Sequence, residues 1–188
     1  MSFLRTLRRS YLKIALFLVG ILIFSAQTPG TREYQIKAIF LFNFTQFIEW
    51  PASSFSTAQS PMVIGILGKD PFGNYLEEVL ANEKANGHAL IAHHYSTIDE
   101  LESDCEILYI NPETPKIETI ITKLKGRNIL TVSEAPNFIK QGGIVRFYTK
   151  DNKIQLQINP EAAKSANLAI SSKLLRLAEI VIPPTKSK

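Results

Sequence analysis

The chain has 188 residues, 45% of them hydrophobic, and a formal net charge of +4 at pH 7. Its positive excess lies in the first 26 residues, which hold no acidic residue and four basic ones: Arg5, Arg8, Arg9 and Lys13. The rest of the chain is close to neutral, which argues against a nucleic-acid-binding protein, because such proteins keep a basic face in their folded part.

The N-terminal segment is typical of a secretory signal peptide. Its basic residues precede an unbroken apolar run at 14–24, which ends in the small or polar residues Ser25, Ala26 and Gln27. The run is shorter than the roughly 20 residues that a membrane span needs. We predict a signal peptide over residues 1–26 and export to the periplasm of a Gram-negative bacterium. An uncleaved signal anchor is the alternative, because Phe24 stands where cleavage favours a small residue.

Residues 31–50 form the first predicted helix, which Thr31 caps and Pro51 ends. Its apolar residues are too numerous for one stripe. Such a helix is either buried on several sides in its own core or shared with another molecule. Its large aromatic residues are therefore our candidates for self-association into a homodimer: Phe40, Phe44, Phe47 and Trp50.

The middle of the chain alternates between apolar runs of strand length and short amphipathic segments. Buried strands are predicted at residues 62–67, 89–95, 105–110 and 128–132. Helices are predicted from Pro71 to residue 80, at 98–101, at 117–124 and, as a single turn, at 136–140. This order favours a mostly parallel sheet with helices on both faces.

The last third predicts an antiparallel hairpin at one edge of that sheet. Its strands are expected at residues 144–148 and 154–158, with Asp151 and Asn152 as turn residues. Asn159-Pro160 then begins a short helix, and Ser171 or Ser172 caps a final helix that runs to Pro183. The predicted fold is a single three-layer α/β domain over residues 31–182.

A glycine pattern follows the first predicted strand: Gly65, Gly68 and Gly73. It lacks the Gly-Lys-Ser/Thr ending of a phosphate-binding loop, so a strand-to-helix turn is the better interpretation. If a small ligand binds, fold analogy places it beyond the carboxyl ends of the strands. The candidate ligand-binding residues at those ends are Lys69, Asp70, Asn111, Ser133 and Glu134.

No constellation in the chain predicts catalysis or metal binding. Cys105 is the only cysteine, which rules out an intrachain disulfide, and its apolar neighbours indicate a small buried group. One cysteine and three histidines exclude ordinary zinc and iron–sulfur sites. The pair Ser171 and Lys173 is better explained by a helix cap than by a nucleophile and its base. We therefore expect no enzyme, no metal and no cofactor.

An ordered string of motifs resembles the YfiR family of periplasmic proteins. The resemblance is carried by residues 37–51 (KAIFLFNFTQFIEWP), 65–73 (GILGKDPFG), 105–110 (CEILYI), 129–133 (ILTVS), Phe138 with 142–144 (GGI), 158–159 (IN), 162–163 (AA) and 170–178 (ISSKLLRLA). It spans nearly all of the chain beyond the signal peptide, and its first and last motifs are quite specific.

The resemblance implies a non-enzymatic regulator that contacts the periplasmic part of a membrane-bound diguanylate cyclase and represses its signalling. This lowers cyclic-di-GMP signalling and biofilm formation. It also implies a tendency to dimerise. Family members that sit beside sensor kinases or outer-membrane receptors leave the identity of the partner open. Redox control through an intramolecular disulfide does not carry over, because Cys105 has no second cysteine to pair with.

Surplus apolar residues between the hairpin and the last helix are the candidates for the partner surface: Phe147, Ile158, Leu168 and Ile170. The leading hypothesis is an exported regulator that binds a membrane sensor, either a diguanylate cyclase or a kinase. The alternative is a periplasmic small-molecule binding module that feeds a sensor or a transporter. A deep pocket at the strand ends, with converging polar groups, favours the alternative.

Overall fold

The computed structural model describes residues 29–101 and 105–183, so the predicted signal peptide at 1–26 lies outside the described residues. The chain divides into two units, Met1–Arg32 and Glu33–Lys188. The first unit is described only at residues 29–32, the beginning of helix α2 (Pro29–Phe47). The fold and the sites below belong to the second unit.

Three strands that are buried along their whole length form the middle of the sheet. They are β2 (Met62–Leu67), β5 (Ile107–Ile110) and β6 (Leu130–Ser133). Strands that are apolar throughout need cover on both faces, as a parallel sheet between helices provides. Outside them lie β4 (His88–Tyr95), β7 (Val145–Lys150) and β8 (Lys153–Ile158), and the two-residue strands β3 (Lys84–Ala85) and β10 (Glu179–Ile180).

Within the described residues the strand order of the main sheet is β10-β8-β7-β6-β5-β2-β4-β3. Neighbours from β4 to β7 run parallel, whereas β8 is antiparallel to β7 and β3 is antiparallel to β4. Asp151 and Asn152 join β7 to β8 with φ angles of 50° and 60°, as a two-residue hairpin turn requires. The predicted fold class is confirmed, and the short β10 extends the sheet beyond the hairpin.

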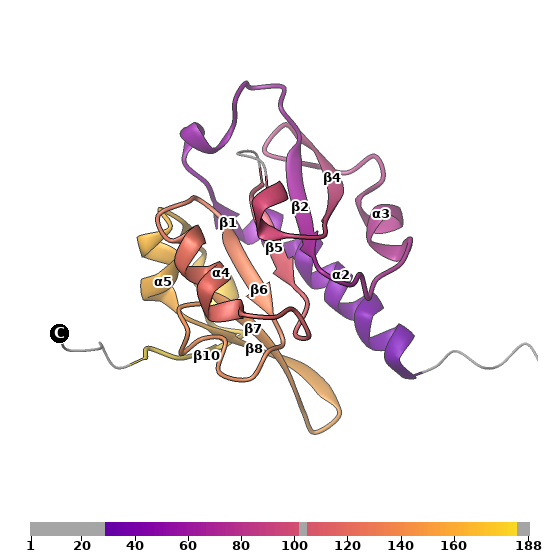
Figure 1. Cartoon of the computed structure of the whole chain (residues 1–188). Coiled ribbons are helices and arrows are strands. Elements are labelled where there is room, and N and C mark those ends of the chain that lie inside the picture. Colours follow the sequence, from indigo (N-terminus) through magenta and orange to yellow (C-terminus); the bar gives the residue numbers. More distant parts are fainter. Residues whose placement is uncertain (1–28, 102–104, 184–188) are drawn as a thin grey trace, which may run out of the picture. The chain divides into compact units, whose positions relative to one another are not determined.

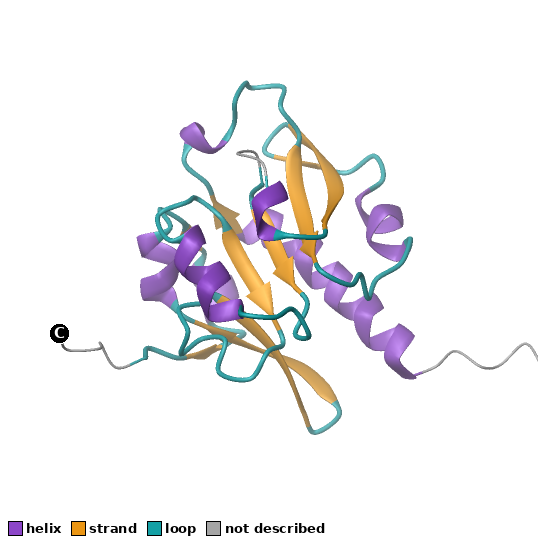
Figure 2. Cartoon of the chain, in the orientation of Figure 1, coloured by secondary structure: helices purple, strands orange, loops and turns teal. Residues whose placement is uncertain are grey.

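Helices cover both faces of this sheet (Figure 2). Figure 1 shows α2 behind the central strands and α4 (Ile117–Leu124) in front of them. One buried cluster contains residues of α2, of α3 (Tyr75–Leu80) and of the sheet face that α2 covers. A second cluster contains the buried residues of α4 and the side chains beneath them. Helices α5 (Pro160–Ser165) and α6 (Ser172–Leu175) follow the hairpin, and 3-10 turns stand at Ala52–Ser54 and Ile98–Glu100.

The first and last predicted helices end earlier than expected. Helix α2 ends at Phe47 because Ile48–Glu49 leaves it as strand β1, which pairs with β9 (Ala169–Ile170). The final helix ends at Leu175, and Glu179–Ile180 pairs with β8 instead of continuing it. In both places pairing with a distant segment replaces the local helical pattern.

The other element predictions differ less from the structure. Helix α3 begins at Tyr75, so Pro71 lies in the loop before it and does not start it. Helix α4 has the predicted bounds. The predicted cap at Ser171 is confirmed, because its hydroxyl oxygen accepts a hydrogen bond from the backbone of Leu174. The helix predicted from Asn159-Pro160 is also present, and the Asn159 side chain caps it by accepting from the backbone of Ala162. The predicted cap at Thr31 is wrong, because α2 begins at Pro29.

Candidate functional site

The order of connections makes one crevice at the carboxyl edge of the sheet. From β2 the chain goes to β4 on one side and then to β5 on the other, so the connections after β2 and β5 leave in opposite directions. Ligands of open α/β sheets bind at such a switch point. The predicted ligand residues Lys69, Asp70 and Asn111 lie in the segments after these strands, and Ser133 ends β6.

The polar atoms of these predicted residues hold the loops in place. The Asn111 side chain donates to the carbonyl oxygen of Lys69 at 2.7 Å and accepts from the backbone of Glu113. The Ser133 hydroxyl donates to the carbonyl oxygen of Ile110 at 2.7 Å. Because buried polar groups of this kind are already hydrogen-bonded, they have a structural role here. Ligand binding by these residues stays a prediction.

Asp70 is likewise engaged with its own loop. Its carboxylate accepts from the backbone of Phe72 at 2.8 Å, and the ring of His94 lies 3.2 Å away. The preceding glycine pattern also has a packing role, since Tyr95 and Cys105 lie so close to Gly65 that a side chain at this position would collide with them. These contacts support the interpretation as a strand-to-helix turn.

The structure places a buried lysine at this edge that is not among the predicted site residues. Lys37 of α2 is 1% exposed, and its ammonium group donates to the carboxylates of Glu33 and Glu134, each at 2.5 Å. Glu33 lies one turn earlier in α2, whereas Glu134 directly follows β6. The centroid of the Tyr34 ring lies 4.4 Å from the same ammonium group. A buried charge requires such paired partners.

Tyr109 of β5 completes what we call the Lys37 cluster: Glu33, Tyr34, Lys37, Tyr109 and Glu134. The Tyr109 hydroxyl donates to the Glu134 carboxylate at 2.7 Å. Burial, with the negative charge of Glu134 next in size, raises the pKa of Tyr109 above its ordinary value of 10.0. Burial also raises the pKa of Tyr34, again assisted by the Glu134 charge. Both phenols are therefore neutral hydrogen-bonding groups at physiological pH.

Aromatic rings fill the space beside the Lys37 cluster. The Phe72 ring, from the loop after β2, meets Tyr109 edge-on at 4.9 Å between centroids and Tyr34 at 5.7 Å. The loop after β2 is thus held against β5 and α2 by the protein's own aromatic side chains. Lys37 is held by two carboxylates, and the phenols are protonated. The cluster therefore fastens α2 to the sheet and does not assemble a nucleophile with an acid and a base.

Some sequence signal for this cluster exists. Lys37 is a charged residue inside a helix that is otherwise apolar nearly all round, and such a residue indicates a buried ion pair. Glu134 is among the residues predicted at the strand ends. What the sequence does not show is that these two residues meet, because 97 positions separate them.

The comparison with protein families decides where this chain belongs. A family model described as YfiR/HmsC-like matches residues 34–179, well over half of the chain. The chain belongs to the YfiR/HmsC-like family. The comparison with curated proteins gave no match. In this YfiR/HmsC-like protein the matched range includes Lys37, Tyr109 and Glu134 and ends within β10.

The side chains predicted to face a partner of the YfiR/HmsC-like protein lie mostly in its core. Phe147 and Ile158 are fully buried, and Leu168 is 6% exposed. The Phe147 ring stacks on Phe44 of α2 with 6.1 Å between centroids, because the apolar side of the hairpin packs against that helix. In this structure these three side chains belong to the core and are not exposed for contact with another molecule. Partner binding by this region stays a prediction. Ile170, partly buried, pairs with Ile48 between β9 and β1.

The residues predicted for self-association are also largely used within the chain. Phe44 is fully buried, and Phe40, Phe47 and Trp50 are partly buried against the same core. The Trp50 indole donates to the carbonyl oxygen of Glu106 at 3.1 Å. The sequence allows two interpretations of this helix: burial on several sides in its own core, or contact with another molecule. Burial in its own core explains most of these four aromatic residues. Self-association itself stays a prediction.

Cys105 is buried, as expected from its strand-like surroundings. Burial, with the negative charge of Glu106 next in size, raises the pKa of its thiol to about 12. Within residues 29–101 and 105–183, we find no group of acidic, histidine or cysteine side chains suited to a metal ion. In the same residues, no helix has the length and hydrophobicity that a membrane crossing requires.

Proposed function

We propose that this YfiR/HmsC-like protein is an exported, non-enzymatic regulator that binds the periplasmic part of a membrane sensor and represses its signalling. The sensor is a diguanylate cyclase or a sensor kinase. Membership of the YfiR/HmsC-like family is the observation that carries the proposal. The near-neutral charge of the chain beyond residue 26 agrees with a protein partner and not with a nucleic acid.

The packing at this edge of the sheet supports regulation in preference to catalysis. Open α/β enzymes place their substrates at the switch point of the sheet. Here the Phe72 ring, from the loop after β2, packs on Tyr109 of β5, and the Lys37 ammonium group is paired with two carboxylates. These contacts hold α2 against the sheet, and a protein that works by contact with a partner needs no substrate cleft.

Three exposed apolar side chains lie near the region predicted for partner contact, because Ile180 pairs with Ile158. They are Leu177, Ile180 and Ile182, which are 69%, 45% and 64% exposed. We call these three residues the C-terminal apolar strip. Beside it, Glu179 accepts hydrogen bonds from Tyr148 and Gln157 of the hairpin. Large apolar side chains beside tyrosine are typical of protein interfaces.

The proposal is tested by capture of the sensor from solubilised membranes with the purified protein. We expect an inner-membrane cyclase or kinase to be retained, and a strain lacking the protein to show raised sensor output. The variant Ile180→Arg should release the sensor and raise its output. Its matched control is Ile91→Arg, because Ile91 of β4 is 40% exposed but lies outside the strip.

Two results contradict the proposal. One is unchanged sensor output in the deletion strain. The other is full repression by a variant that carries arginine at all three positions of the C-terminal apolar strip and retains the wild-type melting temperature. The second result rejects the strip as the interface, and the first rejects the regulatory role itself.

A further inference from the structure

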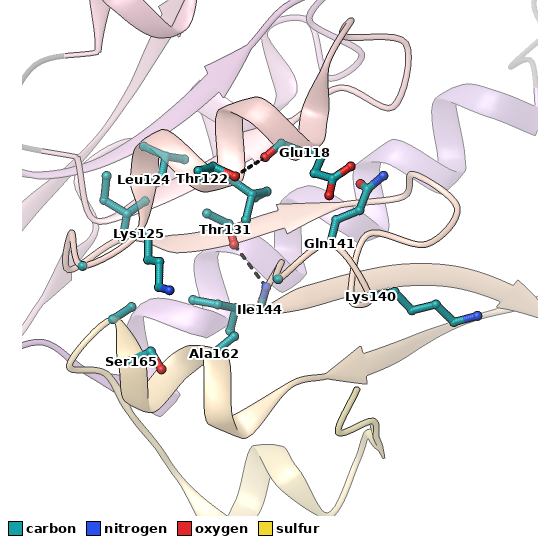
Figure 3. Close-up of a pocket in the computed structure, with 15 residues that line it drawn as sticks. Glu118, Thr122, Leu124, Lys125, Thr131, Lys140, Gln141, Ile144, Ala162 and Ser165 are labelled. Carbon is teal, nitrogen blue, oxygen red and sulfur yellow. Dashed lines mark hydrogen bonds between the residues drawn. The ribbon is translucent and has the colours of Figure 1, made fainter. Parts of the chain in front are cut away.

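A groove of about 400 Å³ opens between α4 and α5 and shares no residue with the Lys37 cluster (Figure 3). Its volume lies in the range of about 300–1,000 Å³ that is common for small-molecule sites. Part of its wall is made of small residues, among them Ala162 and Ser165 of α5 and Gly142. A β-carbon at Gly142 would lie 3.3 Å from the side chain of Ile121, so the glycine helps to keep the groove open.

The floor of the groove is apolar. Ile121 and Leu124 of α4, Ile129 before β6 and Ile144 before β7 all line it, and each is less than 9% exposed. They are core residues, and the small part of each that stays exposed lines the groove. An apolar chain or ring laid on this floor would be removed from water, which is the main favourable contribution to binding such a group.

A polar group and a cation stand at the same groove. Thr131 is 5% exposed, and its hydroxyl oxygen accepts a hydrogen bond from the backbone of Ile144 at 3.1 Å. That contact uses the oxygen as an acceptor and leaves the hydroxyl proton for a ligand. Figure 3 shows the Lys125 side chain pointing into the groove, whereas Lys140 points away from it. Among the described residues, the Lys125 ammonium group has no ion-pair partner.

The charges also orient a ligand. Figure 3 shows the carboxylate of Glu118 beside the amide of Gln141, on the side of the groove away from Lys125. A negative group on the ligand is repelled by Glu118 and attracted by Lys125. A carboxylate is the complement of a lysine ammonium group and a hydroxyl proton.

We propose that the α4–α5 groove binds a small amphipathic monocarboxylate. The carboxylate contacts Lys125 and Thr131, and the apolar part lies over Ile121, Ile129 and Ile144. This inference goes beyond the regulatory role, because binding is a property of the isolated protein and does not require the sensor. Its failure and the failure of the proposed function are therefore measured separately.

The test is titration of the purified protein with sodium octanoate, followed by calorimetry and by amide chemical shifts. We expect saturable binding that raises the melting temperature. The shifts should concentrate in residues 121–131 and 162–166. Octanol has the same chain without the charge, and we expect it to bind about tenfold more weakly, since one charge-assisted contact is lost.

Matched lysine variants separate the site from general surface charge. Lys125→Gln should weaken octanoate binding about tenfold, whereas Lys140→Gln should leave it unchanged. Ala162→Phe fills the groove and should abolish binding, with the melting temperature as the check on folding. Equal loss in the two lysine variants, equal binding of octanol, shifts outside the groove or no binding at millimolar octanoate each overturns the proposal.

Discussion

Lys37 and Glu134 are 97 positions apart, yet the Lys37 ammonium group donates a hydrogen bond to the Glu134 carboxylate and joins α2 to the end of β6. The contact is nearly closed to water, because the side chain of Lys37 is 2% exposed and that of Glu134 is 19% exposed. Glu33 shares the same ammonium group, but its side chain is 40% exposed. The two carboxylates should therefore contribute differently to stability.

Replacing Lys37 should lower the free energy of unfolding more than replacing one of its acidic partners. In Lys37→Met the Glu134 carboxylate remains partly buried without its cation, so we expect the free energy of unfolding to fall by about 3 kcal/mol. Glu33→Gln removes only the carboxylate that is 40% exposed, within one helix, and should cost about 0–1 kcal/mol. Urea denaturation at neutral pH measures the free energy of unfolding of both variants and of the wild type.

The double variant Lys37→Met, Glu134→Leu is the control for that interpretation. Removing both buried charges should recover part of the stability that Lys37→Met loses, because the unpaired carboxylate is gone. If the double variant is as unstable as the sum of the two single variants, the pair is not coupled as the structure indicates.

The buried phenols and the buried thiol predict a loss of stability at alkaline pH. The pKa of Tyr109 is raised in the folded state, so above pH 10.0 the unfolded chain releases this proton while the folded chain retains it. Cys105 acts in the same direction above its ordinary value of 9.0. The free energy of unfolding should therefore be constant with respect to these groups below pH 9 and fall as the pH rises further.

Tyr109→Phe isolates the phenol's part in this effect. The variant loses the hydrogen bond to Glu134 and should be less stable by about 1–2 kcal/mol at neutral pH. Its stability should then fall less steeply above pH 10 than that of the wild type. Denaturation midpoints across this pH range give the slope of stability against pH. An identical slope in the variant and the wild type contradicts a protonated Tyr109 in the folded state.

Cys105 should be unreactive in the folded protein. With a pKa of about 12, about one thiol in ten thousand is ionised at pH 8. Its side chain is also buried, at 2% exposure. We expect negligible labelling by a thiol reagent in native conditions and complete labelling in urea. Fast native labelling would mean that β5 opens locally far more often than its burial indicates.

The strands were predictable where their local pattern agreed with their final environment. The runs that became β2, β5 and β6 are apolar throughout, and their burial on both faces follows from that pattern alone. The hairpin followed from Asp151 and Asn152, two residues that tolerate positive φ angles. Here local preference and tertiary packing favour the same structure.

The missed features all depend on contacts between distant segments. Ile48 and Ile180 read as helical residues, but each joins a two-residue strand whose partner lies far along the chain. Phe147 and Ile158 read as surplus apolar residues because the sequence does not show that α2 crosses that face of the sheet. A hydrophobic pattern predicts which residues avoid water, but not whether their own chain or a partner covers them.

Self-association through α2, if it occurs, has to use the residues that the core leaves exposed. The exposed large apolar residues of α2 are Ile36 and Ile39, at 41% and 42% exposure, whereas Phe44 is buried. The double variant Ile36→Glu, Ile39→Glu should therefore convert a dimer into a monomer, because charges there are desolvated on association. Its own unfolding free energy should change by less than about 1 kcal/mol, since both positions face water.

Light scattering after size-exclusion chromatography measures the mass. Ile91→Glu, on a comparably exposed residue of β4, should leave the mass unchanged. A dimer that survives the α2 charges, or one that Ile91→Glu dissociates, places the contact elsewhere.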